Sequence, residues 1–266
     1  MSLAGRVALV TGGNRGIGRA ISIGLAEDGA DVALNYRRDA ESAAETVATI
    51  EALGRKAVAF QASVDDYEQD VALVDKVLAA FGHIDILVNN AGISSRGNIV
   101  AETDPAELER VLRIHAFAPH HLSSLVIPSM RERPRGDIIM ISSAATRRFE
   151  PSGGPYNMGK AAMEALATTL AQEERHHDIH VNVVAPGVAD TKMGLKLMQA
   201  TAGVETLREL DHKMPFGHFC TPEEVAHVVR FLVSEGAAYI TGERIYVDGL
   251  AGALYSEGKL RREKFS

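Results

Sequence analysis

The chain has 266 residues, of which 46% are hydrophobic, and a formal net charge of −7 at neutral pH. This length and apolar content fit one large α/β domain, and the negative balance argues against nucleic-acid binding, which favours a basic face. No apolar run is long enough to cross a membrane, and no signal-peptide pattern precedes the first apolar run. The single cysteine, Cys220, excludes an internal disulfide framework and is typical of a reducing compartment. We therefore expect a cytoplasmic protein with no nucleic-acid or membrane partner.

Short apolar runs alternate with segments of helical length along the whole chain. They predict seven strands, at Val7–Val10, Val32–Asn35, Ala57–Phe60, Ile84–Val88, Ile138–Ile141, Val181–Ala185 and Ile245–Val247. Val, Ile and Leu follow one another in these runs without strict alternation, which is typical of strands buried on both faces. We predict an α/β fold in which helices cover both faces of a doubly wound parallel sheet, as one domain over residues 1–255.

Further signals mark helix starts and one insertion. Asp104 and Thr221 are each followed by proline and, at the third position, by glutamate, a pattern typical of helix N-termini. The stretch Asp190–Cys220 shows no strand, and so long an insertion in a compact domain is usually functional, so we predict a lid at about residues 190–220. The charged residues 256–266 are expected to form a C-terminal tail that is mobile or packs on another subunit.

A glycine-rich turn links the first predicted strand to a helical pattern at 19–28. Glycines at such a turn let a pyrophosphate approach the amides at a helix N-terminus. The spacing is Gly-x-x-x-Gly-x-Gly, which differs from the plain dinucleotide pattern, and a glycine-rich turn without a ligand is the competing interpretation. The residues that we predict to bind a dinucleotide here are Gly12, Asn14, Arg15, Gly16, Ile17 and Gly18.

The end of the second strand favours NADP(H) over NAD(H). An NAD site usually has an acidic residue there for the ribose 2′-hydroxyl, whereas this chain has Tyr36 followed by Arg37. Arg15 and Arg37 together offer charge-assisted hydrogen bonds to a 2′-phosphate. The competing interpretation is that both arginines are solvated surface charges.

Tyr156 and Lys160 are four residues apart at the start of a helical run, so they lie on the same helix face. A neighbouring ammonium group favours the phenolate and should lower the pKa of the tyrosine. Ser143 ends the fifth strand region thirteen residues before the tyrosine.

These motifs together resemble the short-chain dehydrogenase/reductase family in its compact single-domain form, from about Gly5 to Gly249. The segments that carry the resemblance are the turn Thr11–Gly18, Asn89-Asn90-Ala91-Gly92, Ser143, Tyr156, Lys160, Asn182–Gly187, Thr191, Tyr239–Gly242 and Val247–Gly249. The pattern is most similar to 3-ketoacyl-carrier-protein reductases and glucose-dehydrogenase-like members. The resemblance implies a Rossmann-type fold and an oxidoreductase that transfers a hydride between NADP(H) and a carbonyl or secondary alcohol.

The resemblance also implies roles for the matching residues. Tyr156 would be the general acid or base, and Ser143 would hydrogen-bond the substrate oxygen. Lys160 would hold the nicotinamide ribose, while Ala189 and Thr191 would anchor the carboxamide. This chemistry is consistent, because hydride transfer to a carbonyl creates an oxyanion that needs a positioned proton donor and a hydrogen-bond partner.

Two positions depart from the family pattern. His115 stands where the family has an asparagine whose main-chain carbonyl binds a relay water. Pro119 has no N–H to bond that carbonyl, so we predict that the relay persists and that the imidazole is optional; a titrating relay histidine and a satisfied core histidine are the alternatives. Ser63-Val64 replaces the Asp-Val that touches adenine, although serine can still accept a hydrogen bond. The matching Asn90 would lie along the adenosine half of the cofactor.

Substrate-facing residues are expected at the carboxyl ends of the strands. The candidates are Ser94 to Arg96, Ala145 to Phe149 and, in the lid, Met193, Leu195, Leu197 and Met198. The lid side chains are equally consistent with packing of the lid. Arg147 and Arg148 suit a carboxylate or phosphate, or are solvated.

Two further clusters have bland alternatives. Arg131, Arg133 and Arg135 suit an acidic carrier protein or a solvated helix end. The histidines at 176, 177 and 180 lack accompanying carboxylates, so we predict no metal site.

A small-molecule carbonyl or alcohol is therefore the expected substrate. The alternative is an NADP(H)-binding sensor with little turnover, which predicts a damaged Ser/Tyr/Lys set. Enoyl reductases of the family have tyrosine and lysine seven apart, but position 163 is Met163. The family commonly forms tetramers, and the small apolar residues of 161–170 suit a close helix contact, so a homo-oligomer (tetramer or dimer) is expected.

Overall fold

The computed structural model describes residues 2–251, and the predicted tail at 256–266 lies outside this range. Its centre is one parallel sheet with the strand order β3-β2-β1-β4-β5-β6-β7. The strands are β1 (Val7–Val10), β2 (Asp31–Tyr36), β3 (Ala57–Gln61), β4 (Ile86–Asn89), β5 (Gly136–Ile141), β6 (Ile179–Pro186) and β7 (Arg244–Val247). All seven predicted strands are confirmed, with ends within two residues of those observed. Because the chain leaves β1 in both directions across the sheet, a crevice at the carboxyl ends of β1 and β4 is the expected ligand site.

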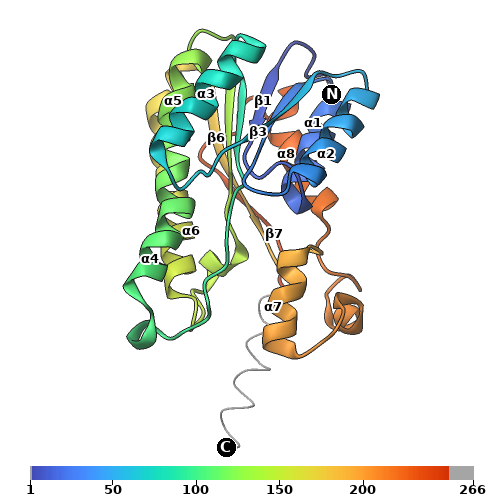
Figure 1. Ribbon diagram of the computed structural model, residues 1–266, viewed down its shortest axis with the longest axis vertical. Coiled ribbons are helices and arrows are strands. Elements are labelled where there is room, and N and C mark those ends of the chain that lie inside the picture. Colours follow the sequence, from blue (N-terminus) through green and yellow to red (C-terminus); the bar gives the residue numbers. More distant parts are fainter. Residues whose placement is uncertain (1, 252–266) are drawn as a thin grey trace, which may run out of the picture.

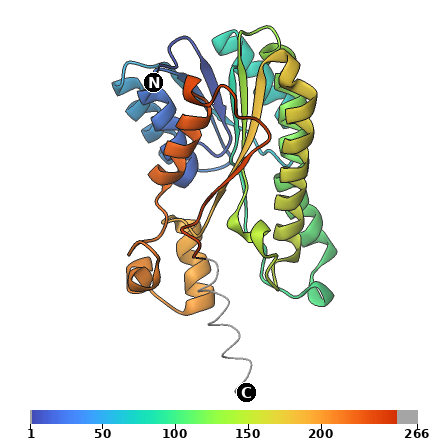
Figure 2. The ribbon, with the colours of Figure 1, turned by 180° about the vertical axis from the view of Figure 1, so that it is seen from behind.

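Helices cover both faces of the sheet (Figures 1 and 2). One layer consists of α1 (Gly16–Glu27), α2 (Ala40–Ala52) and α8 (Pro222–Leu232). The other layer consists of α3 (Tyr67–Phe81), α5 (Ala118–Met130) and α6 (Gly154–Glu174). Each layer buries its own apolar core against the strands, which explains why the strand sequences are apolar on both faces. The remaining α-helices are α4 (Pro105–Leu112) and α7 (Lys192–Ala202).

Short helices complete the architecture. The 3₁₀ turns are η1 (Val100–Glu102), η3 (Ala144–Arg147), η4 (Arg175–His177), η5 (Leu207–Lys213) and η6 (Glu235–Ala237), and η2 (Arg113–Phe117) is a π-helix. The π-helix lies between α4 and α5, so that residues 105–130 form one continuous helical segment. The sequence did not predict this π-helix. Such single-turn π-helices often occur at functional sites.

Both predicted helix starts are confirmed, with one difference in detail. The Thr221 hydroxyl accepts a hydrogen bond from the Glu224 amide, and the Glu224 carboxylate accepts one from the Thr221 amide, a complete capping box. Asp104 caps α4 by accepting from the Ala106 amide at 2.9 Å. Glu107 does not reach back to this cap; it is buried and accepts from the amide of Arg96.

The residues 190–220 form a small unit beyond the carboxyl ends of the strands (Figures 1 and 2). It contains α7 and η5 and has its own apolar core. The buried members of that core are Met198, Leu207, Leu210, Met214 and Phe219. The predicted absence of a strand holds for this segment, whose base is joined by a single bridge between Ala189 and Cys220.

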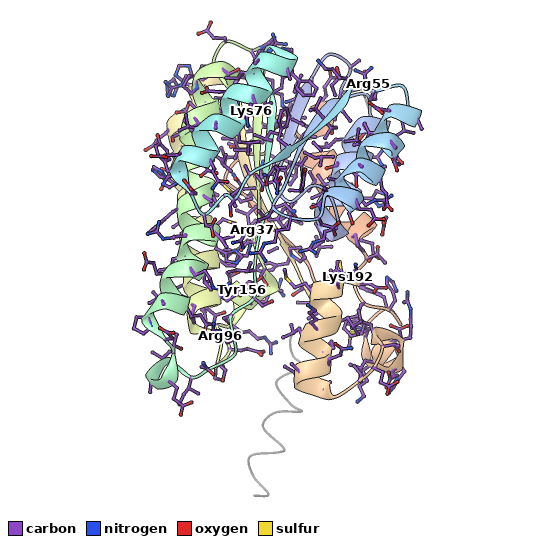
Figure 3. The ribbon with its side chains drawn as sticks, viewed as in Figure 1. Arg37, Arg55, Lys76, Arg96, Tyr156 and Lys192 are labelled. Atoms are coloured by element: carbon purple, nitrogen blue, oxygen red, sulfur yellow. The ribbon has the colours of Figure 1, made fainter. Side chains whose placement is uncertain are left out.

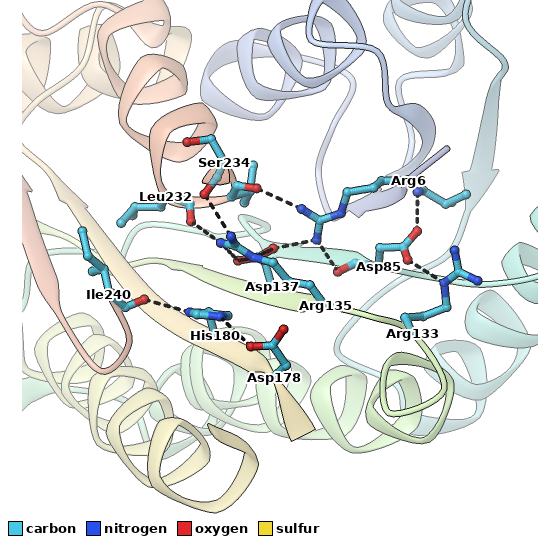
Figure 4. Close-up of polar contacts among 12 residues, drawn as sticks. Arg6, Asp85, Arg133, Arg135, Asp137, Asp178, His180, Leu232, Ser234 and Ile240 are labelled. Carbon is cyan, nitrogen blue, oxygen red and sulfur yellow. Dashed lines mark hydrogen bonds and ion pairs between the residues drawn. The ribbon is translucent and has the colours of Figure 1, made fainter. Parts of the chain in front are cut away.

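The amino ends of the strands carry a network of ion pairs (Figure 4). Asp137, which is fully buried, lies 2.6 Å from a guanidinium nitrogen of Arg6 and 2.8 Å from one of Arg135. Arg133 pairs with Asp85 at 2.8 Å. Arg133 and Arg135 are thus not simply solvated, because their carboxylate partners stand at the starts of β4 and β5.

The remaining members of these clusters are also engaged. Arg131 donates two hydrogen bonds to Glu174. His180 contacts the Ile240 carbonyl and Asp178, and the rings of His176 and His177 lie 4.2 Å apart. Within residues 2–251, no group of three potential ligands that could hold a metal occurs, and no helix is long and apolar enough to cross a membrane.

Candidate active site

The glycine turn after β1 has the shape of a phosphate cradle. Gly12 and Gly16 have positive φ values of 60° and 52°, a region that favours glycine. A Cβ on Gly18 would lie 2.2 Å from the carbonyl oxygen of Gly12, so only glycine fits this contact. The turn opens α1, and the N-terminus of a helix is a favourable place for a pyrophosphate.

Two asparagines hold this turn from the sides. The Asn90 amide donates to the Thr11 carbonyl at 2.8 Å, so this side chain supports the turn after β1. The buried Asn14 amide donates to the Asp39 carbonyl at 3.2 Å. Both side chains therefore stabilise the loop, and a contact of either with the cofactor remains a prediction.

The other predicted members of the turn differ in exposure. Arg15 is exposed at the N-cap of α1, and its side chain makes no capping hydrogen bond. Ile17 is half-buried and packs on the core beneath α1. Only Arg15 is thus free to reach a charged group above the turn.

A cavity of about 600 Å³ lies at the ends of β2 and β3. Its lining residues are Arg37, Arg38, Gln61, Ala62, Ser63, Asp65, Asp66 and Gln69. Arg37 is half-exposed and lies 3.8 Å from Asp65, which also accepts a hydrogen bond from the Ser63 hydroxyl. Val64 is buried in the core. Because the Ser63 hydroxyl already donates to Asp65, it can only accept a hydrogen bond from an adenine. The Arg37 side chain remains accessible to a ligand.

Tyr156, Lys160 and Ser143 converge at the carboxyl end of β5. The helix α6 begins at Gly154, so Tyr156 and Lys160 share its first two turns and one face. The Lys160 ammonium donates to the Ile141 carbonyl at 2.6 Å and lies 5.8 Å from the centre of the Tyr156 ring. Ser143 is hydrogen-bonded to the Tyr156 hydroxyl. Figure 3 shows Tyr156, Arg37 and Lys192 near the middle of the long axis of the molecule.

The protonation of this group differs from the sequence prediction. Burial raises the pKa of Tyr156, and the hydrogen bond with Ser143 opposes this rise. Burial also lowers the pKa of Lys160 to about 7, against the favourable charge of Glu164. The sequence prediction of a lowered Tyr156 pKa is therefore wrong in its net direction, because burial of the phenol is the largest influence on that pKa and raises it.

His115 lies in the π-helix η2 behind the tyrosine. Its ring is buried, with Nε2 at 2.8 Å from the Ile93 carbonyl and 3.2 Å from the Ile93 amide. The ring meets that of Tyr156 edge to face, with centroids 5.2 Å apart. A Cβ on Gly159 would lie 2.7 Å from the His115 Cβ, so this glycine allows the close approach of α6. Burial, followed by the charge of Lys160, lowers the pKa of His115 to about 3, so the imidazole is neutral at working pH.

Comparison with known proteins agrees with this geometry. A family model described as enoyl-(acyl carrier protein) reductase matches residues 12–249. The 3-oxoacyl-[acyl-carrier-protein] reductase FabG of Staphylococcus aureus is 35% identical over 242 residues, covering 91% of this chain and 96% of that protein. A solved short chain dehydrogenase from Burkholderia cenocepacia J2315 in complex with NADP is 36% identical, with a TM-score of 0.85 over 94% of this chain and 99% of that chain. An NAD+-bound xylitol dehydrogenase is 27% identical, with a TM-score of 0.85 over 93% and 99%.

The chain belongs to the short-chain dehydrogenase/reductase family. It is accordingly an oxidoreductase that acts on CH–OH or C=O groups. The predicted Rossmann-type fold of one domain is confirmed by the sheet order and by the solved relatives. One of these relatives binds NADP and another binds NAD+. The cofactor preference of this short-chain dehydrogenase/reductase must therefore be inferred from its own residues.

In this family member, the base of the 190–220 unit adjoins the phosphate turn. Thr191 caps α7 by accepting from the Gly194 amide at 3.1 Å, and its methyl carbon would lie 3.3 Å from a Cβ on Gly16. Ala189 is buried, and its carbonyl would lie 2.0 Å from a Cβ on Gly194. Of the two residues predicted to anchor the carboxamide, Thr191 thus lies beside the turn predicted to bind the pyrophosphate, and Ala189 precedes it by two residues.

The substrate-side candidates divide into packed and exposed groups. In the 190–220 unit, Met198 is buried and Leu195 packs on the same core, whereas Met193 and Leu197 are exposed. Arg147 remains partly exposed, and its guanidinium lies 3.9 Å from the centre of the Tyr246 ring and 3.9 Å from an Asp248 carboxylate oxygen.

Arg96 and the two serines before it, Ser94 and Ser95, were also predicted to face the substrate. Arg96 lies on the side of Tyr156 and α4, opposite α7 (Figure 3), and its amide donates to Glu107. Ser94 is exposed and Ser95 is half-buried in the same loop.

Sequence reasoning missed Glu164. This side chain is largely buried next to the catalytic candidates and contacts Ser142, Thr146 and Arg244. The available signal was its spacing, because positions 156, 160 and 164 follow one face of a helix at intervals of four.

Proposed function

We propose that this protein is an NADP(H)-dependent ketone reductase or secondary-alcohol dehydrogenase with Tyr156 as general acid and base. The observation that carries the proposal is the convergence of three groups. The Tyr156 hydroxyl is hydrogen-bonded to Ser143, and Lys160 follows one helical turn behind. A phenol that is held neutral by burial and paired with a second hydroxyl is suited to protonate an oxyanion.

Each residue has a defined part in the proposed reaction. The cofactor, when bound, supplies or accepts the hydride. Tyr156 gives a proton to the carbonyl oxygen in reduction and takes it back in oxidation. Ser143 donates a hydrogen bond to the same oxygen, and Lys160 holds the nicotinamide ribose. The turn Gly12–Gly18 holds the pyrophosphate, with Asn90, Ala189 and Thr191 along the cofactor.

We infer a preference for NADP(H) from charge at the adenosine end. Arg15 and Arg37 are both exposed there, and no carboxylate stands at the end of β2, where Tyr36 lies. Asp65 competes for Arg37, but only through a contact of 3.8 Å. Titration of the protein with NADPH and NADH, followed by nucleotide fluorescence, measures the preference. Binding of NADH that is as tight as, or tighter than, binding of NADPH would contradict this assignment.

The decisive test of the reaction compares the protein with Tyr156→Phe. We expect the protein to oxidise NADPH with members of a panel of ketones, and the variant to lose at least about 1000-fold in kcat while binding NADPH unchanged, because the phenol is the proton donor. Binding of NADPH without turnover on any substrate would favour the sensor. Turnover that survives in Tyr156→Phe would contradict the role of the tyrosine.

The panel should include a 2-enoyl thioester, because the matching family model is described as an enoyl reductase. Met163 stands seven residues after Tyr156 and is fully buried in the core, so no lysine occupies that position. We therefore expect no reduction of the enoyl compound.

We further propose a homo-oligomeric, cytoplasmic enzyme. The outer side of α6 carries the exposed small residues Ala162 and Ala165, and Phe117 is exposed on η2, an element that packs against α6. Such a surface suits a close helix contact between subunits. Burial raises the pKa of the partly buried Cys220 to about 12, which disfavours the thiolate, and a single free thiol is consistent with a reducing compartment.

A further inference from the structure

Glu164 is the most connected carboxylate near the catalytic candidates. It lies on α6 one turn after Lys160, and its side chain is only 11% exposed. Its Oε1 accepts hydrogen bonds from the Ser142 hydroxyl at 2.6 Å and from the Thr146 hydroxyl at 2.7 Å. Its Oε2 pairs with Arg244 of β7. A carboxylate at this depth is expected to have such partners, but their location is informative.

Two of these partners flank Ser143. Ser142 is the preceding residue, and Thr146 lies in η3, the turn that Ser143 itself caps. The Thr146 hydroxyl is within hydrogen-bond distance of both the Glu164 carboxylate and, at 2.8 Å, the Ser143 carbonyl. Glu164 therefore holds the segment that carries Ser143 at both of its ends.

The third partner adds β7 to the same assembly. Arg244 lies 5.1 Å from the centre of the Tyr246 ring, and Arg147 of η3 lies 3.9 Å from it. The chain of contacts from Glu164 through Arg244 and Tyr246 thus returns to η3. The segment 142–147 is fixed to α6 on one side and to β7 on the other.

Glu164 also bears on Lys160 electrically. Its charge favours the ammonium form and opposes the lowering of the Lys160 pKa by burial. A single side chain therefore acts on the position of Ser143 and on the charge of Lys160.

We propose that Glu164 is a positioning residue that sets the Ser143 hydroxyl against Tyr156 and places a negative charge one helical turn from Lys160. This inference rests on the proposed function, since it concerns the same three groups. It predicts that the two effects separate in variants, because the hydrogen bonds need an acceptor and the effect on Lys160 needs a negative charge.

The test uses Glu164→Gln, Thr146→Val and, as a matched control, Glu173→Gln, an exposed position on the same helix. Turnover of the best ketone and alcohol is measured across pH, together with NADPH affinity and thermal unfolding. We expect Glu164→Gln to lower kcat by at least about 10-fold and to move the acidic limb of alcohol oxidation to higher pH by about half a unit or more, since an uncharged lysine no longer favours the phenolate. NADPH affinity should change by less than about threefold.

The second variant isolates the hydrogen bonds. Thr146→Val should lower kcat without moving the pH profile, because the Glu164 charge remains. Glu173→Gln should resemble the wild type in every measurement. If Glu164→Gln does not fold, a lower kcat in Thr146→Val with an unchanged pH profile still supports the positioning of Ser143. An unchanged kcat in Thr146→Val refutes it.

Wild-type kcat and pH profile in a folded Glu164→Gln would overturn the inference, as would a loss of unfolding temperature alone. Tyr156→Phe distinguishes this failure from failure of the proposed function. Loss of turnover in Tyr156→Phe with normal Glu164→Gln refutes only the role of Glu164, whereas unchanged turnover in Tyr156→Phe refutes the proposed function itself.

Discussion

His115 shows how a substituted residue can preserve a local arrangement. Its Nε2 lies within hydrogen-bond distance of both the carbonyl and the amide of Ile93, although one nitrogen can satisfy only one of them at a time. An asparagine amide has both a donor and an acceptor and could satisfy both. Pro119 has no N–H to donate to the His115 carbonyl, so we still predict that this oxygen binds a relay water.

We therefore predict that His115→Asn retains kcat to within about threefold. The imidazole is neutral because burial holds its pKa near 3, so it contributes no limb to the pH–rate profile between pH 5 and 9. Steady-state kinetics on the variant across this range tests both statements. His115→Ala is the matched comparison, and it should be less stable by about 1–3 kcal/mol, because the Ile93 groups lose their partner. A loss of 100-fold or more in His115→Asn would make the imidazole itself part of the relay.

At the residue scale, the sequence predicted the members of the candidate site but not their state. Tyr156, Lys160 and Ser143 lie together because helix periodicity and the end of β5 are both legible in the chain. The pKa of Tyr156 was misjudged because desolvation depends on the residues that cover it, which come from η2, η3 and β5. Glu164 escaped notice because its partners Thr146 and Arg244 are not recognisable as such before folding.

At the element scale, the packing of α3 against α5 contains one ionisable group in an apolar contact. Asp70 is fully buried, and neither of its oxygens has a hydrogen-bond donor. The nearest ionisable partner is His121 of α5, with Nδ1 at 3.4 Å, and burial lowers the pKa of this histidine and so disfavours its charged form. Burial raises the pKa of Asp70 to about 8, and the neighbouring carboxylates Asp66 and Asp65 add to this rise. Among the described residues of α3, α5 and α6, no other acidic side chain is buried without a hydrogen-bond or ion-pair partner.

We predict that Asp70→Asn is more stable than the wild type above about pH 4. Below that pH both folded and unfolded chains hold a neutral Asp70. As the pH rises toward 8, the unfolded chain ionises at its ordinary value while the folded chain stays neutral, so the wild type loses up to about 1.4 kcal/mol per pH unit, and the loss stops above about pH 8. Urea unfolding of both proteins between pH 4 and 9 measures the difference.

The exposed Asp75 on the same helix supplies the control for this experiment. Asp75→Asn should run parallel to the wild type at every pH. A constant difference between Asp70→Asn and the wild type would mean that Asp70 is ionised in the folded protein and that its environment is more polar than the geometry indicates.

The elements themselves were largely legible, and the exceptions have physical reasons. Strands that are buried on both faces have continuous apolar sequences, which predict them well. The capping residues Asp104 and Thr221 likewise predict the starts of their helices. The π-helix at Arg113–Phe117 leaves no comparable signature, because it depends on one extra residue being accommodated between α4 and α5. The Glu107 side chain was expected to cap α4, but it is buried and instead accepts a hydrogen bond from the Arg96 amide.

At the scale of the whole molecule, the two ends of the sheet have different tasks. The carboxyl ends hold the glycine turn and the Tyr156 group, whereas the amino ends hold the ion pairs around Asp137 and Asp85 (Figure 4). Those pairs join residues that are far apart in the chain, such as Arg6 and Asp137. This is why the arginines at 131–135 were read from the sequence as surface charges.

This separation predicts that stability can be reduced at one end without a change in chemistry at the other. Asp137→Asn should lower the free energy of unfolding by about 3 kcal/mol, because two arginines lose the charge of a fully buried partner. The loss is limited because Arg6 also donates to the Val233 carbonyl and Arg135 to the Ser234 carbonyl. Below the unfolding transition, kcat/KM and NADPH affinity should match the wild type.

Asp178→Asn is the matched control, since Asp178 begins the neighbouring strand region but its side chain is 65% exposed. It should change the free energy of unfolding by less than about 0.5 kcal/mol. Urea unfolding and steady-state kinetics on both variants test the prediction together. A fall in kcat/KM in folded Asp137→Asn would show that the amino ends of β4 and β5 transmit their arrangement to Ser143, and that the two ends of the sheet are coupled.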